Sequence, residues 1–278
     1  MLRSSNPILS KKDAFTPAAP QYGQQFGQQP YQSYPGQSGF GGPQDPYSQA
    51  PRTVQGRMTL DDVITKTAVT IGILVLTAAL AWNFVPDSLY FPAMIVSALV
   101  GFVVVLLVSF RRVISPGLVV LYAAIEGVFI GMISKVFEQV YTGIVAQAVV
   151  ATFVAAGVTL AAYKFFNIRV TAKFTKVVFI STAAFAGLLL INFIFSLVTG
   201  SGGLRGGITG PVSPFVYLIS AIAIVLAVLN LVLDFDYVER GIEMGAPANE
   251  SWRAAFGLTV TMVWLYIELL RLTSLIRR

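Results

Sequence analysis

The segment Val225-Leu-Ala-Val-Leu-Asn-Leu-Val-Leu-Asp234-Phe-Asp236 is the end of a long apolar run that finishes in two carboxylates. A further acid, Glu268, lies in the final apolar run, at about residues 254–276. A carboxylate inside a membrane-length apolar segment costs about 2.5–3.5 kcal/mol on insertion scales. Such acids normally face a bundle interior or a water path, which makes Asp234 and Glu268 candidate functional residues.

The composition predicts an all-α integral membrane protein. Hydrophobic residues make up 55% of the 278 residues and charged residues only 12%, which lies outside the range of soluble domains. The apolar residues come in long blocks, as bilayer-spanning helices require. The net charge of +6 lies mostly in short loops, so it indicates topology rather than nucleic-acid binding.

Several chemistries are excluded by residue types that the sequence lacks. Without cysteine there is no disulfide, thiolate metal site or cysteine nucleophile, and without histidine the usual zinc ligand and pH switch are missing. No acid has an evident nucleophile partner. We therefore expect neither an enzyme nor a bound cofactor, and any response to pH must come from carboxylates.

Residues 1–56 are predicted to form a disordered cytoplasmic tail ahead of a transmembrane domain at residues 57–278. Residues 18–51 are rich in Gln, Gly, Pro, Tyr and Ser, and cannot bury enough apolar surface to offset their ordering entropy. An adhesive tail, whose Tyr and Phe side chains bind partners or self-associate, is the open alternative. Residues 1–12 lack the apolar core of a secretory signal, so the first span is expected to direct insertion.

Seven segments have about the 20 residues that a spanning helix needs. They lie at about residues 63–85, 89–110, 117–137, 144–165, 177–198, 215–237 and 254–276. Thr59, followed by Asp61 and Asp62, predicts a capped helix start before the first span. The Gly-rich residues 200–210 predict a flexible external loop.

Basic residues concentrate in alternate loops. Arg111 and Arg112 lie between spans two and three, and further Lys and Arg residues precede span one and lie between spans four and five and spans six and seven. The positive-inside rule then places the N-terminus in the cytoplasm, and seven spans place the C-terminus outside. We expect a multi-pass protein of a bacterial-type cell membrane.

The two acids that end span six point in different directions. Asn230 and Asp234 lie one helical turn apart on one face. That face continues backward through small residues, which are Ala227, Ala223 and Ser220. Asp236 lies about 200° around the helix from Asp234 and four residues before Arg240, a favourable helical pair. We predict that Asp234 faces the bundle and that Asp236 is structural.

Span three contains one acid, in Tyr122-Ala-Ala-Ile-Glu126-Gly127-Val-Phe-Ile-Gly131. Gly127 and Gly131 form a small-xxx-small face that allows close helix contact. Tyr122 lies one turn before Glu126, so its phenol could donate a hydrogen bond to the carboxyl group. Glu126 is therefore either a neutral hydrogen-bonded residue or part of an ion path.

Glu268 has two open interpretations. It could pair with Arg271 near the outer interface, or it could turn inward and meet Asp234. Asp234 ends its apolar run, whereas Glu268 lies past the middle of its own. The two reach one depth only if span six continues to about Gly241 or span seven starts late.

Four motifs resemble the Bax inhibitor-1 family, the transmembrane Bax-inhibitor-motif proteins that include YccA-like bacterial members. The span-three segment resembles the family's third helix, and Ile144-Val-Ala-Gln147-Ala-Val-Val-Ala-Thr152 with Tyr163-Lys164 is similar to its fourth. Leu233-Asp234 resembles the acid of its sixth helix. Trp264-Leu-Tyr266-Ile-Glu268-Leu-Leu-Arg271-Leu is similar to its last helix, which usually has aspartate where Glu268 stands. The resemblance covers about residues 60–278.

The resemblance implies seven helices with the last one central. For some members it also implies a pH-sensitive calcium leak, gated by carboxylates on the sixth and seventh helices and an arginine at the end of the second. Here these residues are Asp234, Glu268, and Arg111 or Arg112. Two acids close together in a low-dielectric site cannot both ionise cheaply, so the pair would share a proton. Loss of that proton would leave oxygen ligands of the type that calcium prefers.

Two functions follow as hypotheses. The first is a pH-sensitive cation leak that is gated by Asp234 and Glu268, with calcium as the expected ion. These two acids would bind calcium transiently. The candidate site also includes Arg111, Arg112, Glu126 and Asn230. The second is a non-conducting adaptor that modulates a membrane protease or another membrane complex. The expected partners are the lipid bilayer, calcium or protons, and such a protease, without nucleic acid.

Overall fold

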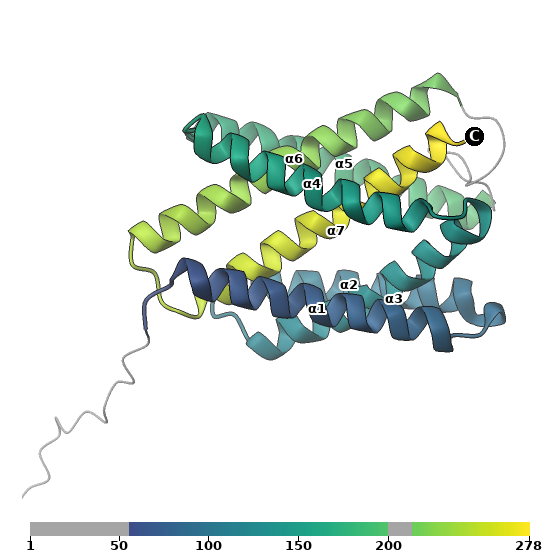
Figure 1. Ribbon diagram of the computed structural model, residues 1–278, viewed down its shortest axis with the longest axis horizontal. Coiled ribbons are helices and arrows are strands. Elements are labelled where there is room, and N and C mark those ends of the chain that lie inside the picture. Colours follow the sequence, from purple (N-terminus) through teal and green to yellow (C-terminus); the bar gives the residue numbers. More distant parts are fainter. Residues whose placement is uncertain (1–55, 200–212) are drawn as a thin grey trace, which may run out of the picture. The chain divides into compact units, whose positions relative to one another are not determined.

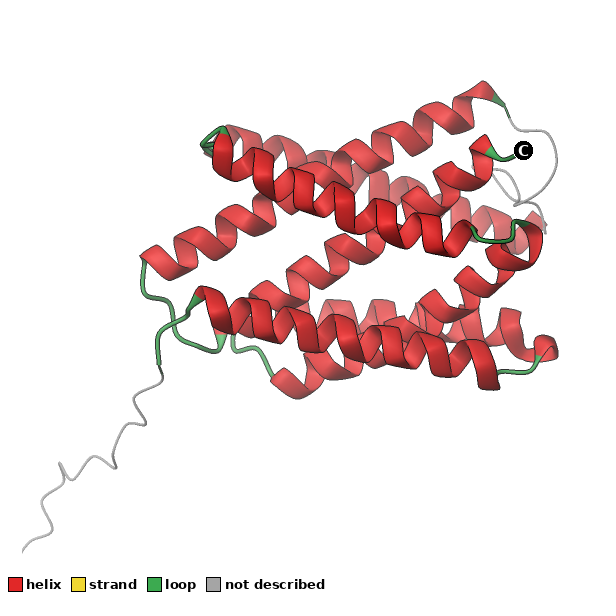
Figure 2. Ribbon diagram, in the orientation of Figure 1, coloured by secondary structure: helices red, strands yellow, loops and turns green. Residues whose placement is uncertain are grey.

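The computed structural model describes residues 56–199 and 213–278 of the chain (Figure 1). The predicted tail at residues 1–56 lies outside these ranges except for Gly56, and so does the predicted loop at residues 200–210. Within the described ranges, all regular structure is helical apart from one isolated β-bridge between Arg57 and Pro247 (Figure 2). The predicted all-α fold class is confirmed.

Seven helices of the described ranges are long and apolar enough to cross a membrane. They are α1 (Leu60–Phe84), α2 (Tyr90–Phe110), α3 (Pro116–Val140), α4 (Ile144–Phe165), α5 (Ala172–Thr199), α6 (Pro214–Glu243) and α7 (Glu250–Ile276), and a short 3-10 helix, η1 (Asp87–Leu89), precedes α2. Their order agrees with the seven predicted spans. The chain is therefore a multi-pass membrane protein.

Local signals set several helix ends. The Thr59 side chain caps α1 and accepts a hydrogen bond from the backbone N–H of Asp62 at 3.2 Å, as predicted. Ser213 caps α6, and Pro214 occupies its first turn, where a missing N–H costs nothing. Gly143 turns the chain between α3 and α4 with a φ of 81°, a conformation that glycine adopts without steric strain.

Helices α6 and α7 extend further than their apolar runs. α6 continues to Glu243 rather than ending near residue 237, and α7 begins at Glu250 rather than near residue 254. The added turns contain Glu239, Arg240 and Arg253. Helical hydrogen bonding continues into the interfacial region because charged side chains there can reach water.

Helix α7 is the central element of the bundle. It packs against α1, α3, α4 and α6, and Figure 1 shows it in yellow, crossing between α1–α3 and α4–α6. Leu265 and Leu270 are fully buried at 0% exposure. The central last helix implied by the family resemblance is confirmed.

Helices α1 and α3 pack closely through the two glycines of α3. A Cβ added to Gly131 would lie 2.5 Å from the carbonyl oxygen of Ala78, and one added to Gly127 would overlap Leu74 and Thr77. The missing side chains let the two backbones approach each other. The predicted packing role of Gly127 and Gly131 is confirmed.

The residues just before α1 are attached to the loop between α6 and α7. We call Gly56–Met58 the strap. The Met58 N–H donates to the Ala246 carbonyl, and the Ala248 N–H donates to the Gly56 carbonyl, both at 2.7 Å. The Met58 side chain is 2% exposed and packs on Gly241 of α6, where an added Cβ would lie 2.9 Å from the Met58 sulfur.

Candidate functional site

Asp236 forms the local ion pair that its spacing predicts. Its Oδ2 lies 2.9 Å from Nε of Arg240, four residues later on α6. The Arg240 guanidinium also donates a hydrogen bond to the Val170 carbonyl at 2.6 Å, which links α6 to the segment before α5. Asp236 thus has a partner on its own helix.

Asp234 faces α7, as predicted. Its Oδ2 accepts a hydrogen bond from the Thr261 hydroxyl at 2.6 Å. A Cβ added to Gly257, one turn earlier on α7, would lie 3.2 Å from Asp234 Oδ1. The small side chain of Gly257 therefore leaves room for the carboxyl group against α7. The residues that precede Asp234 on the same stripe, Ser220, Ala223 and Ala227, are buried.

Two cavities meet at Asp234. One of about 450 Å³ is lined by the strap residue Met58, by α6 and by the α6–α7 loop. The other, of about 250 Å³, is lined by the end of α2 and the start of α7. Asp234 and Tyr237 line both cavities. Cavities of this size have room for water, and polar side chains such as Asp234 and Tyr237 line both of them, so water can approach Asp234 from the loop side.

A polar network lies beside these cavities. Glu250 accepts hydrogen bonds from the Tyr237 hydroxyl at 2.8 Å and from Arg253 Nε at 2.7 Å. Nη2 of Arg253 also donates to the backbone carbonyl groups of Arg111 and Arg112, at 3.3 and 3.0 Å. The network connects the end of α2 and the start of α7 to α6, where Tyr237 lies within one turn of Asp234.

The arginines that line the two cavities at Asp234 are Arg240 and Arg253, and neither Arg111 nor Arg112 lines them. Arg111 and Arg112 are exposed, and within the described residues their side chains form no ion pair. The positive-inside pattern counts Arg253 only among the basic residues between spans six and seven, and neither Tyr237 nor Glu250 is predicted as a site residue. The three-residue spacing of Glu250 and Arg253 at a helix start is a signal that could have found this pair.

Glu268 is buried at 1% exposure and lies seven residues beyond Thr261 on α7. At a rise of 1.5 Å per residue, this spacing is about 10 Å along the helix axis. Among the described residues, no hydrogen bond joins Asp234 and Glu268. The structure therefore does not bring the two carboxylates to one level, although both lie along α7.

Asn230 and Glu126 lie apart from the Asp234 contact with α7. The Asn230 amide donates to the Thr182 hydroxyl of α5 at 2.7 Å, so it faces α5. Glu126 faces α2, where a Cβ added to Gly101 would lie 3.1 Å from its Oε2. Within the described residues no hydrogen bond joins Tyr122 to Glu126, and the Tyr122 ring packs edge-on against Phe256 of α7.

The carboxylates are spread through the bundle. Across residues 56–199 and 213–278, no group of three or more Asp or Glu side chains is arranged to hold a metal ion. Asp234 lies against the central helix α7, and Glu268 is buried within that helix.

Comparison with known proteins identifies the family. A search of curated protein sequences finds no significant match. A family model described as Bax inhibitor 1 like matches residues 6–278. The match takes in all seven helices and also most of the tail, which the motif resemblance over residues 60–278 had left out. This protein therefore belongs to the Bax inhibitor 1 like family.

Proposed function

We propose that this protein is a pH-sensitive cation leak, with calcium as its substrate, in which Asp234 controls entry to a path along α7. One observation carries the proposal: the Asp234 carboxyl group is held by Thr261 of α7, at 2.6 Å, where two cavities meet. Carboxylate oxygens are the ligands that calcium prefers. The calcium leak implied for some relatives supports the same assignment. The proposed activity is transport, without a catalytic step.

Glu268 is the second carboxylate of the proposed path. At a helical rise of about 1.5 Å per residue, it lies about 10 Å further along the axis of α7 than Thr261. Conduction requires sites that bind an ion favourably enough to admit it and weakly enough to release it. Two single carboxylates in succession fit this requirement better than one shared, tightly binding site. Asp234 and Glu268 would then act one after the other rather than as a hydrogen-bonded pair.

The proposed pH response follows from the cost of charge in the bundle. A protonated Asp234 is neutral, and its hydrogen bond with Thr261 keeps α6 and α7 together. An ionised Asp234 attracts cations and water from the two cavities. Cation flux should therefore rise as the pH rises through the range in which Asp234 loses its proton.

Calcium flux into liposomes that contain this protein alone tests the proposal. Asp234→Asn should lower the flux at least tenfold at high pH and flatten its pH profile, and Glu268→Gln should lower the flux. Asp236→Asn is the matched control, since Asp236 is paired with Arg240 at 2.9 Å, and it should keep the wild-type profile. The proposal is wrong if both acid variants match the wild type or if the wild type gives no flux above empty liposomes.

The second candidate is the non-conducting adaptor of a membrane protease or another membrane complex. The strap favours it, because the strap connects the residues before Gly56 to the loop beside Asp234. An adaptor gives no flux in liposomes. In cells, its function should require residues 1–56 and should survive both Asp234→Asn and Glu268→Gln.

A further inference from the structure

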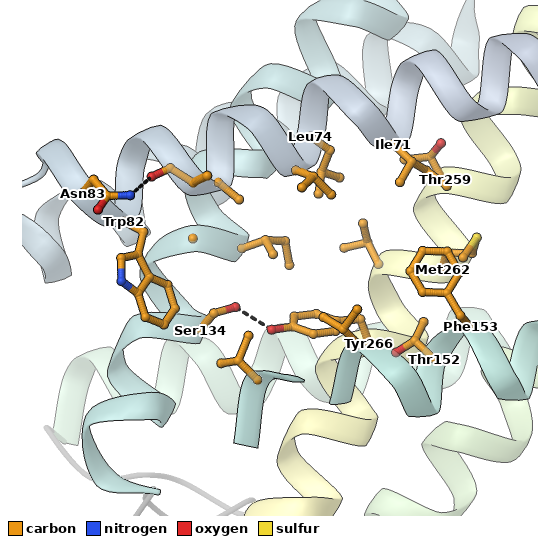
Figure 3. Close-up of a pocket in the computed structure, with 18 residues that line it drawn as sticks. Ile71, Leu74, Trp82, Asn83, Ser134, Thr152, Phe153, Thr259, Met262 and Tyr266 are labelled. Carbon is orange, nitrogen blue, oxygen red and sulfur yellow. Dashed lines mark hydrogen bonds between the residues drawn. The ribbon is translucent and has the colours of Figure 1, made fainter. Parts of the chain in front are cut away.

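A second, apolar crevice lies on another side of α7, between α1 and α4 (Figure 3). Its floor is formed by α3 and α7, and its volume is about 350 Å³. Small-molecule sites typically measure roughly 300–1,000 Å³. In the described structure the backbones of α1 and α4 do not approach each other closely, so the crevice opens between them. Val75 and Phe153, on its two walls, are 57% and 54% exposed.

Most of the polar side chains that line this crevice already have hydrogen-bond partners within the protein. Ser134 and Tyr266 bond to each other at 2.6 Å, as Figure 3 shows. Asn83, Thr152 and Thr259 each donate to a carbonyl group of their own helix, at 2.8, 2.7 and 2.7 Å. A polar ligand would find few free groups on these walls, because the side-chain donors of Asn83, Thr152 and Thr259 are already used. The crevice thus presents a hydrocarbon surface.

The length of the crevice matches one leaflet of a bilayer. Its lining on α1 runs from Ile71 to Asn83, which is about 18 Å at the helical rise. Half of a hydrocarbon core of about 30 Å is about 15 Å. At one end lie Trp82, an interfacial residue type, and Lys135, whose Nζ donates to the Trp82 carbonyl at 2.8 Å. The crevice therefore runs from a polar rim towards the middle of the bundle.

We propose that one acyl chain of a bilayer phospholipid occupies this crevice. The crevice is continuous with the lipid-facing surface of α1 and α4, so the surrounding hydrocarbon has direct access to it. The acyl chain would fill the space that separates α1 from α4, and it would contact the central helix at Met262 and Tyr266. The flexible Met262 side chain adapts to such a ligand. This site is independent of the proposed cation path.

Quenching of Trp82 fluorescence by brominated acyl chains tests the proposal. Trp252→Phe and Trp264→Phe leave Trp82 as the single tryptophan, since the chain has three. The protein is placed in vesicles of phosphatidylcholine brominated on its acyl chains. Ala79→Phe fills the crevice, because Ala79 lies in its wall. It should reduce the quenching of Trp82 at least twofold. Ala161→Phe, at an exposed position of α4 outside the crevice, is the matched control and should leave the quenching unchanged.

Equal quenching in the two variants would show that bromine reaches Trp82 only from the outer surface, and it would overturn the proposal. Stronger quenching by trace brominated free fatty acid than by the phospholipid would also overturn it. If Ala79→Phe does not fold, Ala79→Leu gives a smaller reduction of the same kind. Native mass spectrometry of the wild type then provides a separate readout, in which one retained phospholipid is expected and none would contradict the site.

Discussion

At the level of single residues, the contact between Asp234 and Thr261 joins two helices through one side-chain hydrogen bond of 2.6 Å. Thr261→Val keeps the shape of the side chain and removes the donor. A hydrogen bond to a buried acid contributes about 1–3 kcal/mol when its loss leaves the acid unsatisfied. We expect a lower thermal unfolding temperature in detergent, and a higher cation flux at acidic pH in liposomes because the closing contact is lost.

Thr259→Val is the control for this prediction. The Thr259 hydroxyl donates to the Ala255 carbonyl of its own helix at 2.7 Å, so its loss affects no contact between helices. It should change stability by less than Thr261→Val and should leave the flux unchanged. Equal effects of the two substitutions would show that the Asp234 contact has no special role.

The residue contacts that could be predicted from the sequence are those set by spacing within one helix. Asp236 and Arg240 lie four residues apart, and the assignment of Asp234 to the packing face depends only on the helical period. The partners of Asp234 depend instead on how α6 and α7 are aligned. No local pattern in the sequence sets that alignment, so Thr261 and Arg253 were not identified as neighbours of Asp234.

At the level of helices, the alignment of α6 and α7 explains why Asp234 and Glu268 lie at different levels. Asp234 lies nine residues before the end of α6 at Glu243, and its partner Thr261 lies eleven residues after the start of α7 at Glu250. In an antiparallel pair joined by a short loop, these positions are neighbours. Apolar runs predicted the number and order of the helices but not their polar end turns, which determine this alignment.

The close contact of α1 and α3 gives a prediction at the same level. Gly131→Ala would bring a Cβ within 2.5 Å of the Ala78 carbonyl oxygen, and backbone must shift to relieve this overlap. Overpacking of this kind costs about 1–3 kcal/mol. Gly157→Ala is the control, since nothing lies within 4 Å of its added Cβ and alanine favours a helix. Thermal unfolding in detergent should show a loss of stability for Gly131→Ala, and a similar loss in both variants would contradict the packing argument.

For the whole molecule, the loop charges predict that the α2–α3 loop lies in the cytoplasm and the α1–α2 loop outside. The chain contains no cysteine, so one introduced cysteine reports on one position. Arg112→Cys and Ser88→Cys place a thiol at exposed positions of these two loops. A membrane-impermeant maleimide should label Ser88→Cys in intact cells and Arg112→Cys only after permeabilisation. The opposite pattern would reverse the orientation, and equal labelling would contradict a single topology.

The strap gives the amino-terminal residues a mechanical connection to the bundle. Two backbone hydrogen bonds of 2.7 Å join Gly56 and Met58 to the α6–α7 loop, and the Met58 side chain lines the larger cavity at Asp234. Tension on the residues before Gly56 would act first on these two bonds and then withdraw Met58 from Gly241. A partner that pulls on the tail would thereby widen the cavity at Asp234 without touching any residue inside the membrane.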